Sequence, residues 1–380
     1  MAADEVRIGV IGAAGRGGSF FRSLLALDGA RVAAACDLNA EGLAKAAEEW
    51  SIPHTFTEYE ALLDAGVADA VVIGTPMPLH AAQAIAALQR GVHVLSEVPA
   101  AVSVEECRQL VRAAAGSEAV YMMAENYCYG ISNVIVGEMT RAGLFGEMYY
   151  AEGHYLHELK ALNEITRWRR KWQTGIDGNT YITHELGPLL QWLAPQRVVQ
   201  VACAGSGHHY VDPRAEAYGI QDVIVTLGRL SGGGLVQCQI DMLSERPHKM
   251  NYYRLQGTLG AYEAGRAPGE ADKVSLRSRP RAPDDQSAMP WEPLENYRQR
   301  FLPEHFRALL EVSAKAGHGG GDFWVLHDFT RAIRQRTAAP IGIHEAMDVT
   351  LPGLISQEAV SAGAWLDVPD SRQWAAADKS

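Results

Sequence analysis

The sequence predicts an α/β domain with a parallel sheet, followed by an α+β domain with a large, mostly antiparallel open sheet. The chain has 380 residues, which is about two domains of roughly 150 residues each. In the first third, short apolar runs alternate with helical patterns, as is typical of a parallel sheet covered on both faces. After about Asn126, longer strand-like runs follow one another, as in an antiparallel sheet. We therefore expect domains at residues 1–126 and 127–380.

The expected elements follow from the periodicity of apolar residues. In the first domain we expect strands at 6–11, 31–36, 70–73, 92–95 and 120–123, with helices at 20–27, 40–50, 78–89 and 104–115. In the second domain we expect strands at 148–156, 198–204, 223–227, 234–243 and 252–257.

Composition narrows the class of protein. Hydrophobic residues make up 47% and charged residues 21%, which excludes a disordered chain. The net charge of −11 argues against nucleic acid as a partner. No apolar run approaches the ~18 residues of a membrane span, and the acidic start does not resemble a signal peptide. We therefore expect a cytoplasmic protein. The five cysteines form no CxxC pair, so we expect neither disulfides nor a metal site.

A glycine-rich turn follows the first expected strand and leads into a helix. Gly12 and Gly17 fit the first and third positions of a dinucleotide-binding GxGxxG motif, while Ala14 stands at the second. Gly15 can take over the close approach to a pyrophosphate, and Arg16 lies beside it. Strand, glycine turn and helix together indicate a Rossmann-type nucleotide site.

Asp37 strengthens this interpretation because it ends the second expected strand, 25 residues after Gly12. A carboxylate in this position accepts hydrogen bonds from a ribose diol and repels a 2′-phosphate. No arginine follows it, since the next residues are Leu38 and Asn39. The sequence therefore predicts NAD rather than NADP as the cofactor.

Three further motifs, at 75–80, 96–99 and 124–127, follow expected parallel strands. The carboxyl ends of such strands form the ligand-binding edge of an open α/β sheet. The expected cofactor contacts in these motifs are Thr75, Pro76, His80, Glu97, Val98 and Asn126.

With the glycine turn, this series resembles the Gfo/Idh/MocA family of nicotinamide-dependent, sugar-handling proteins. The resemblance covers nearly the whole chain, and it implies a Rossmann domain followed by an open-sheet domain that often serves oligomerisation, so we expect a homo-oligomer. Sugar dehydrogenases of the family usually carry Glu-Lys-Pro where this chain has Glu97-Val98-Pro99. Val98 cannot donate, accept or carry charge as that lysine does.

The Glu-Val-Pro pattern is similar to the NAD-dependent glycoside hydrolase branch first known as α-N-acetylgalactosaminidases. The shared motifs lie at 96–100, 122–126, 144–147, 166–169, 181–188 and 318–323. The resemblance implies transient oxidation of a sugar at C3, elimination at C1, addition of water and re-reduction.

Candidate acid–base residues come in two pairs. Tyr155 and His157 are two apart on an expected strand, so they share a face. Tyr181 and His184 are three apart at the start of a helical pattern, so they also point one way. Pro188 lacks an N–H and leaves the carbonyl of His184 without its helical partner. We expect either Tyr181 or His184 to be the base at C2. We expect Tyr155 and His157 to act at the oxidised hydroxyl and the departing oxygen. The structural alternative is that these are packing residues, as a single Tyr or His in a strand more often is.

Three further features have both a functional and a structural interpretation. Glu125 ends a strand at the ligand edge, where it either polarises a catalytic group or caps a helix. The basic run containing Arg167, Trp168 and Arg169 is either a solvated face or an anion subsite on the substrate. His318, before three glycines, lies in a loop that closes over substrate or in a plain linker.

The sequence therefore predicts an NAD-dependent glycosidase acting on a small glycoside. A sulfoquinovoside-like anionic sugar and an N-acetylgalactosaminide are the two candidate substrates. The first alternative is a sugar dehydrogenase or reductase with net hydride transfer, which shares every cofactor feature. The second is a non-catalytic NAD-binding regulator, against which the paired Tyr and His residues argue.

Overall fold

The computed structural model describes residues 5–247, 249–277 and 290–374, and the chain forms two compact units. The first unit takes in the chain up to Tyr129, then Leu309–Thr350, and the chain from Asp370 onward. The second unit is Gly130–Ala308 with Leu351–Pro369. The expected division at residues 126 and 127 lies near the first crossing, but Leu309–Thr350 and the chain from Asp370 onward return to the first unit. Helical periodicity does not reveal which sheet a late helix covers.

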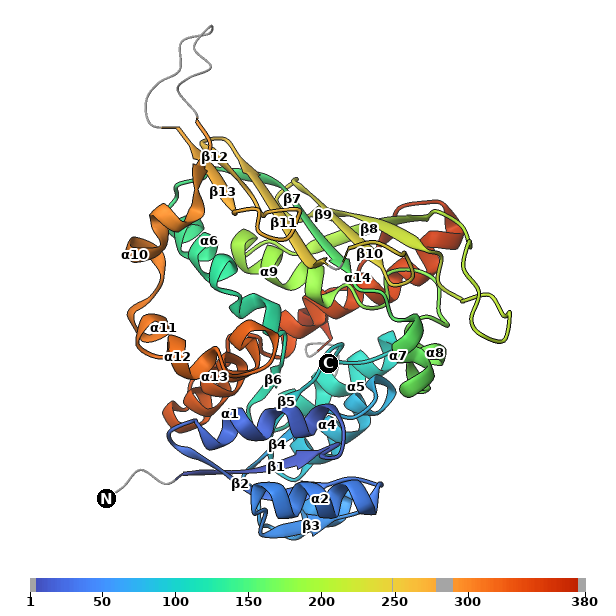
Figure 1. Ribbon diagram of the computed structural model, residues 1–380, viewed down its shortest axis with the longest axis vertical. Helices are drawn as coiled ribbons and strands as arrows, with labels where there is room; N and C mark the ends of the chain where they lie inside the picture. Colours follow the sequence, from blue (N-terminus) through green and yellow to red (C-terminus); the bar gives the residue numbers. More distant parts are fainter. Residues whose placement is uncertain (1–4, 248, 278–289, 375–380) are drawn as a thin grey trace, which may run out of the picture. The chain divides into compact units, whose positions relative to one another are not determined.

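The first unit is built on a six-stranded sheet in which all pairs are parallel. The strand order is β3-β2-β1-β4-β5-β6 (Figure 1), the order of a Rossmann domain. The strands are β1 (Val6–Ile11), β2 (Ala30–Cys36), β3 (His54–Phe56), β4 (Ala70–Ile73), β5 (His93–Ser96) and β6 (Tyr121–Met123). The expected α/β fold is therefore confirmed, and β3, which has no apolar run, is the strand that periodicity missed.

Helices and short helical turns connect and cover these strands. They are η1 (Arg16–Phe20), α1 (Phe21–Leu25), α2 (Ala40–Trp50), α3 (Tyr59–Asp64), η2 (Met77–Leu79), α4 (His80–Gln89), α5 (Val104–Ala115), η3 (Asn126–Tyr129), α12 (Leu310–Ser313), η6 (His318–Gly320), α13 (Gly321–Gln335) and η7 (Ser371–Gln373). Side chains of Asn39 and Ser103 cap α2 and α5 by accepting backbone N–H bonds. α13 packs against β1 and β5, so it belongs to this sheet although it comes late in the chain.

The second unit contains a nine-stranded sheet in the order β14-β13-β12-β11-β7-β10-β9-β8-β15. Its strands are β7 (Met148–Leu156), β8 (Val198–Gly205), β9 (Val223–Leu230), β10 (Leu235–Asp241), β11 (Lys249–Gly257), β12 (Gly260–Glu263), β13 (Lys273–Leu276), β14 (Glu292–Pro293) and β15 (Leu366–Asp367). All neighbours are antiparallel except the pair β7 and β10, which is parallel. The expected mostly antiparallel open sheet is confirmed.

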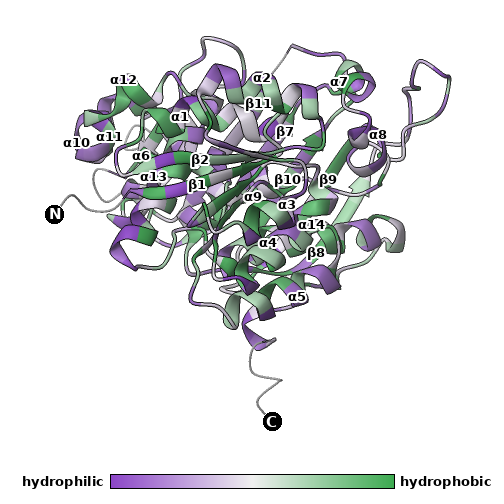
Figure 2. Ribbon diagram, turned by 90° about the horizontal axis from the view of Figure 1, so that it is seen from below, coloured by the Kyte–Doolittle hydropathy of each residue, from purple (hydrophilic) through white to green (hydrophobic). Residues whose placement is uncertain are grey.

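The second unit also contains helices, and those nearest the sheet lie along one of its faces (Figure 1). They are α6 (Ile131–Arg141), α7 (Lys160–Ile165), α8 (Trp168–Trp172), α9 (Thr183–Leu193), η5 (Leu294–Tyr297), α10 (Arg298–Phe301) and α11 (Glu304–Ala308), while α14 (Ile343–Ala362) runs from the first unit into the second. The ribbons of β8 and β9 are mostly hydrophobic and those of α10 and α11 mostly hydrophilic (Figure 2).

Close packing of α9 on β7 decides which side chains face the helix. A Cβ on Gly153 would lie 2.4 Å from the carbonyl oxygen of Glu185, so only glycine admits the helix at this distance. Because successive side chains of a strand point to opposite faces, Tyr155 shares the α9 face with Gly153, and His154 lies on the other face. This alternation separates two polar sites on one strand.

Across the described ranges, no helix combines the length and the apolar character that a membrane crossing requires.

Candidate active site

The glycine turn of the first unit is shaped for a close ligand approach. Gly12 has φ of +86°, and a Cβ there would lie 2.6 Å from the Gly74 carbonyl oxygen. A Cβ on Gly17 would lie 2.8 Å from the Gly12 carbonyl oxygen. At Gly15 the nearest atom to a Cβ would be 3.7 Å away, so the protein itself does not crowd this position. Gly12 and Gly17 thus form the turn, and the open side at Gly15 fits the approach of a pyrophosphate.

Asp37 fastens the glycine turn to the end of β2. Its Oδ2 accepts the N–H of Ala14 at 2.9 Å, and its Oδ1 accepts the N–H of Asn39 at 2.9 Å. The carboxylate remains half-exposed, so it is open to a ribose as well as to the backbone. This arrangement fits the predicted role in selecting NAD.

Arg16 leaves the turn as part of a buried ion network. Its Nε donates to Glu97 at 2.8 Å, and its Nη1 and Nη2 donate to Asp322 at 2.8 and 2.7 Å. Burial opposes the charge of the guanidinium, but the two carboxylates outweigh it and raise the pKa of Arg16 above its ordinary value. Arg16 and Glu97 therefore hold the turn against α13, and their direct contact with cofactor stays a prediction.

Asp322 joins Asn126 and His318 to the same network. Asn126 Nδ2 donates to Asp322 at 2.9 Å, and His318 Nδ1 lies 3.1 Å from both carboxylate oxygens. Burial raises the pKa of Asp322, but the bonds from Arg16 and His318 outweigh this and hold it below its usual range. The Oδ1 of Asn126 is buried and has no hydrogen-bond partner among the described residues. Such an orphaned acceptor at the ligand edge fits a cofactor contact.

The motif after β4 is held mainly by internal contacts. Thr75 Oγ1 donates to Gln83 Oε1 at 2.7 Å, and Pro76 is the residue before η2. The ring nitrogens of His80 lie 2.8 Å from the carbonyl oxygens of Pro99 and Thr75. His80 thus clamps two strand-end turns together, and this occupies both of its nitrogens.

Val98 and Glu125 complete the ligand edge of the first sheet. Val98 is buried at 3% exposure and offers no proton-transferring group. Glu125 is fully buried, and its Oε1 accepts the N–H of Tyr127 at 3.2 Å. Burial, with a contribution from Glu125, raises the pKa of the Cys128 thiol well above its ordinary value. Glu125 therefore caps the turn after β6, as its structural interpretation predicts, and its catalytic role stays a prediction.

The four candidate acid–base side chains meet in the second unit. The Tyr155 Oη lies 2.7 Å from His157 Nδ1, in hydrogen-bond contact. The Tyr155 ring is 5.1 Å from that of His184 and 5.7 Å from that of Tyr181, measured between centroids. Tyr181 and His184 are 4.9 Å apart, edge to face. Two phenols and two imidazoles thus form one cluster, with Tyr155 at the end of β7, His157 just after it, Tyr181 just before α9 and His184 in its first turn.

The second pair is placed differently from the expectation in one respect. α9 begins at Thr183, so Tyr181 lies in the turn before the helix, and only His184 is helical. Pro188 lies inside α9 and cannot donate to the His184 carbonyl, as predicted. Instead the Tyr253 hydroxyl of β11 donates to that carbonyl at 2.6 Å. The sequence therefore revealed that the His184 carbonyl lacks a helical donor, but it gave no signal that the Tyr253 hydroxyl would replace that donor.

A hollow of about 690 Å³ opens beside the cluster, and His157 is part of its wall. This volume lies in the range typical of small-molecule sites, ~300–1,000 Å³. Its other walls are Glu158, Lys160, Ser244, Glu245, Arg246 and Pro247. Lys160 Nζ donates to the Leu243 carbonyl at 2.8 Å and lies 3.2 Å from Glu245. The wall thus combines a proton-transfer group with hydrogen-bonding groups that suit a sugar.

The basic run forms the short helix α8, and its members differ in their surroundings. Arg169 Nη1 donates to Gln173 at 2.7 Å, while its Nε is buried without a partner among the described residues. The Arg169 guanidinium also lies 4.6 Å from the centroid of the Trp168 ring. Arg170 is instead bound to Asp212 and to the Ala217 carbonyl. Arg167 is exposed. Arg169 is therefore the residue of the run with unused, buried donor capacity.

Groups of three or more His, Cys, Asp or Glu side chains that could hold a metal ion are absent from the described part of the chain. The five cysteines are buried and free. Sequence reasoning missed Asp322 as the hub of the network around Arg16, although the residue lies in the 318–323 motif.

Known families match both halves of the chain. Residues 6–125 match "Oxidoreductase family, NAD-binding Rossmann fold", and residues 129–375 match "Glycosyl hydrolase 109, C-terminal domain". A "Glycosyl hydrolase family 109 protein" of Solibacter usitatus is 29% identical over 391 residues, covering 94% of this chain and 86% of that protein. An "Alpha-N-acetylgalactosaminidase" of Shewanella oneidensis is 27% identical over 392 residues, covering 94% and 83%.

Solved structures share the fold at lower identity. A levoglucosan dehydrogenase in complex with NADH superposes with a TM-score of 0.81 at 19% identity, covering 97% of this chain and all of that chain. The WlbA dehydrogenase of Bordetella pertussis, with NADH and UDP-GlcNAcA, gives 0.78 at 20% identity, covering 97% and 99%. The cofactor is NAD, as predicted. The chain belongs to glycosyl hydrolase family 109, with a Gfo/Idh/MocA-type Rossmann domain, and is an NAD-dependent glycosidase.

Proposed function

We propose that the protein hydrolyses a small glycoside by transient oxidation of the sugar at C3. The observation that carries this proposal is the contact cluster of Tyr155, His157, Tyr181 and His184. Elimination and addition at C1 and C2 need several proton transfers and no carboxylate pair flanking the anomeric carbon, which distinguishes them from ordinary glycoside hydrolysis. Histidine, with a reference pKa of ~6.5, suits proton transfer near neutral pH.

Val98 supports a redox-neutral reaction over net dehydrogenation. A dehydrogenase of this architecture is expected to use a lysine at this position to move the proton of the oxidised hydroxyl. The buried Val98 side chain cannot do so, and the proton must pass to a residue of the cluster instead. The same cluster then serves the elimination, so a single set of groups suffices for the whole cycle.

When bound, NAD accepts hydride from C3 and returns it at the end, so the overall reaction consumes only water. The C3 ketone acidifies the proton on C2, and Tyr181 or His184 removes it. The electron pair of that C–H bond forms the C1=C2 double bond as the bond from C1 to the aglycon oxygen breaks. Tyr155 or His157 protonates the departing oxygen. Water then adds to C1, a proton returns to C2, and the product is the free sugar.

The contact between Tyr155 and His157 gives these two residues a physical basis for acting together. Tyrosine has a reference pKa of ~10 and needs a neighbouring proton acceptor or cation to act as a base. His157 Nδ1 stands 2.7 Å from the Tyr155 Oη, within proton-transfer distance. A proton taken from substrate by the phenol can therefore be passed on toward the hollow that His157 lines.

For the substrate we propose a compact sugar bearing an anionic group, recognised by Arg167, Trp168 and Arg169, while a substrate contact of His318 stays a prediction. The unpartnered Nε of Arg169 supports this subsite, because guanidinium groups bind sulfonate and carboxylate in pairs of hydrogen bonds. An N-acetylgalactosaminide, which the name of the Shewanella oneidensis relative suggests, is the second candidate. The expected homo-oligomer and cytoplasmic location stay predictions.

The test is a panel of chromogenic glycosides with neutral, N-acetyl or sulfonate-bearing sugars, assayed with the purified holoenzyme. We expect release of the aglycon without added cofactor and without accumulation of reduced nicotinamide. Consumption of one NAD for each substrate would instead identify a net sugar dehydrogenase. Full activity in a Tyr181→Phe/His184→Asn double variant would contradict the catalytic cluster.

A further inference from the structure

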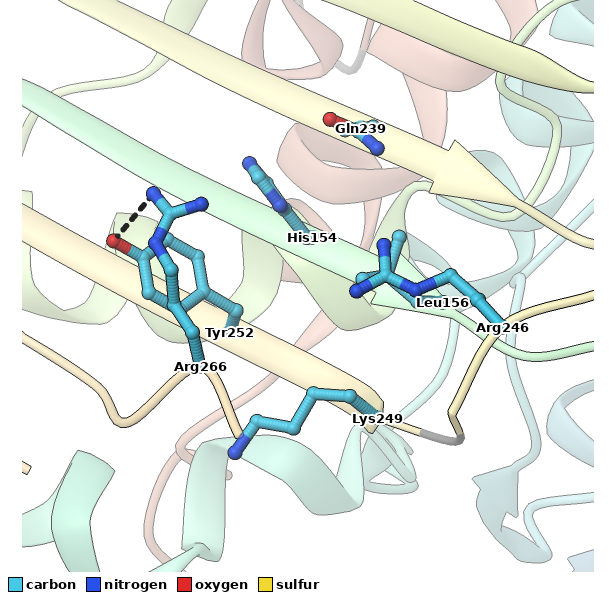
Figure 3. A pocket seen from close by; sticks show the side chains of 7 residues that line it. All are labelled: His154, Leu156, Gln239, Arg246, Lys249, Tyr252 and Arg266. Atoms are coloured by element: carbon cyan, nitrogen blue, oxygen red, sulfur yellow. Dashed lines mark hydrogen bonds between the residues drawn. The ribbon is translucent and has the colours of Figure 1, made fainter. Parts of the chain in front are cut away.

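A second polar site lies on the sheet face opposite the Tyr155 cluster. Its floor is a row of three cross-strand neighbours, with His154 of β7 between Tyr252 of β11 and Gln239 of β10. His154 and Tyr252 are 7% and 2% exposed. Figure 3 shows their side chains and that of Gln239 pointing to the same side of the sheet. Central strands hold this floor in place, which is the condition for a preorganised site.

Three cations form the rim of this pocket. Arg246 and Lys249 come from the connection between β10 and β11 and from the start of β11, and Arg266 follows β12. Figure 3 shows Arg246 and Arg266 on either side of His154. Arg266 Nη2 donates to the Tyr252 hydroxyl at 3.0 Å, and its guanidinium lies 4.3 Å from the centroid of that ring. The aromatic ring therefore orients one of the cations over the pocket.

The three rim cations are not held by direct ion pairs, although Glu152 and Glu263 act on Arg266 at longer range. None of the Arg246, Lys249 and Arg266 side chains forms an ion pair with a carboxylate in the described ranges, whereas the nearby Arg254 and Lys273 both pair with Glu263. The pocket lining, completed by Leu156, includes no acidic residue. In a chain with a net charge of −11, a group of three cations without direct carboxylate partners marks a place that attracts anions.

The buried pair of His154 and Glu152 adds a hydrogen-bonding group to the floor. His154 Nε2 lies 2.6 Å from Glu152 Oε1. The bond from His154, helped by the charge of Arg254, holds the pKa of Glu152 below its ordinary value, so the carboxylate is ionised and Nε2 carries the proton. His154 Nδ1 forms no hydrogen bond with the described side chains or backbone.

We infer that this pocket binds a compact, multiply charged oxyanion of the phosphate type. The cavity measures about 130 Å³, while a single water needs only ~10–15 Å³. Guanidinium groups, an ammonium, an amide and a phenol together offer donors on several sides, which matches a tetrahedral oxyanion better than a planar carboxylate. The site is distinct from the Arg167–Arg169 run and stands whether or not the proposed glycosidase reaction is correct.

The test is titration of the NAD-loaded protein with inorganic phosphate by isothermal calorimetry. Bound NAD keeps phosphate away from the pyrophosphate position. We expect one phosphate per chain, with an affinity that falls as sodium chloride is added. The Lys249→Gln/Arg266→Gln double variant should weaken binding at least about tenfold, because both changes remove charge-assisted donors. Arg246 is left unchanged because it also lines the hollow beside His157.

Three controls make the result decisive. Arg31→Gln/Lys45→Gln removes the same charge from exposed positions of the first unit and should leave phosphate binding unchanged. Lys249→Arg/Arg266→Lys keeps the charge and should retain most of the affinity. Arg169→Gln should also bind phosphate normally, which separates this pocket from the proposed substrate subsite.

Absence of binding to the wild type, or unchanged binding in the Lys249→Gln/Arg266→Gln variant, would overturn the inference. So would a change in oligomeric mass in that variant with no effect of phosphate, which would assign the cations to a second copy of the chain.

Discussion

The Tyr155 hydroxyl and the His157 Nδ1 atom lie 2.7 Å apart, joined by a hydrogen bond between residues two positions apart in the chain. Strand alternation puts both on the face that α9 covers, and α9 brings His184 to within 5.1 Å of the Tyr155 ring. His154 and Tyr155 are neighbours in sequence but point to opposite faces, one toward the oxyanion pocket and one toward the cluster. A single strand therefore contributes to two chemically different sites.

The phenol at the centre of the cluster should be essential for turnover. Tyr155→Phe keeps the ring and removes only the hydroxyl that contacts His157. We expect kcat for glycoside hydrolysis to fall roughly 10²–10⁴-fold, the usual size of a lost acid–base contribution, with KM little changed. The measurement is steady-state hydrolysis of a chromogenic glycoside by holoenzyme. The control is Tyr149→Phe, which changes an exposed tyrosine of the same strand, and equal rates in the two variants would exclude Tyr155 from catalysis.

The anion subsite makes a prediction about specificity. Arg169→Gln removes the guanidinium with the unpartnered Nε. We expect KM for a sulfonate-bearing glycoside to rise at least about tenfold, since charged hydrogen bonds contribute roughly 1.5–3 kcal/mol each, while KM for a neutral glycoside stays the same. Lys171→Gln, a cation on the same helix outside the shared motif, should leave both constants unchanged. An equal rise for both substrates would mean that Arg169 supports the fold rather than the anionic group.

The hydroxyl of Tyr253 should stabilise the kinked helix α9. It donates to the His184 carbonyl that Pro188 leaves without a helical donor. Tyr253→Phe leaves a buried acceptor unsatisfied and should lower the free energy of unfolding by ~1–3 kcal/mol, read from urea denaturation. In a Pro188→Ala background the new N–H can reach the same carbonyl, so the loss should be smaller. If the two changes are strictly additive, the proposed compensation is absent.

The lowered pKa of Asp212 should make the free energy of unfolding depend on pH. Burial alone would raise its pKa, but N–H bonds from Glu216 and Arg214 and the guanidinium groups of Arg214 and Arg170 lower it to about 2. An unfolded Asp titrates near ~3.9, so the depressed pKa stabilises the fold above this pH, and the contribution is lost as pH falls from about 4 toward about 2.

The variant that reports this effect is Asp212→Asn. The wild type should be more stable than the variant at neutral pH, and the gap in urea midpoint should narrow below about pH 4 as Asp212 becomes protonated. The control is Glu41→Gln, which breaks an exposed ion pair with Lys45 on one helix, and its urea midpoint should stay close to that of the wild type at any pH. A gap for Asp212→Asn that persists unchanged at pH 3 would contradict the lowered pKa.

The sequence predicted more of the local chemistry than of the long-range pairing. Buried strands such as Ala70–Ile73 were visible as apolar runs, and the Tyr155–His157 pair followed from the period of a strand, whereas Tyr181 precedes the helix that its spacing predicted. The bond from Tyr253 to His184 and the ion pairs of Arg16 with Glu97 and Asp322 join residues 69, 81 and 306 positions apart. No local pattern encodes such pairs, because they depend on which helix covers which strand. For the same reason the return of α13 to the first sheet was not foreseen.

The measurement that tests the central claim most directly is proton NMR of the sugar product formed in D₂O by holoenzyme without added cofactor. If C3 is oxidised transiently, the proton on C2 is exchanged, and the product should carry deuterium at C2 while the absorbance of reduced nicotinamide returns to its starting level. A product with its original hydrogen at C2, or accumulation of reduced nicotinamide in proportion to substrate, would contradict the account.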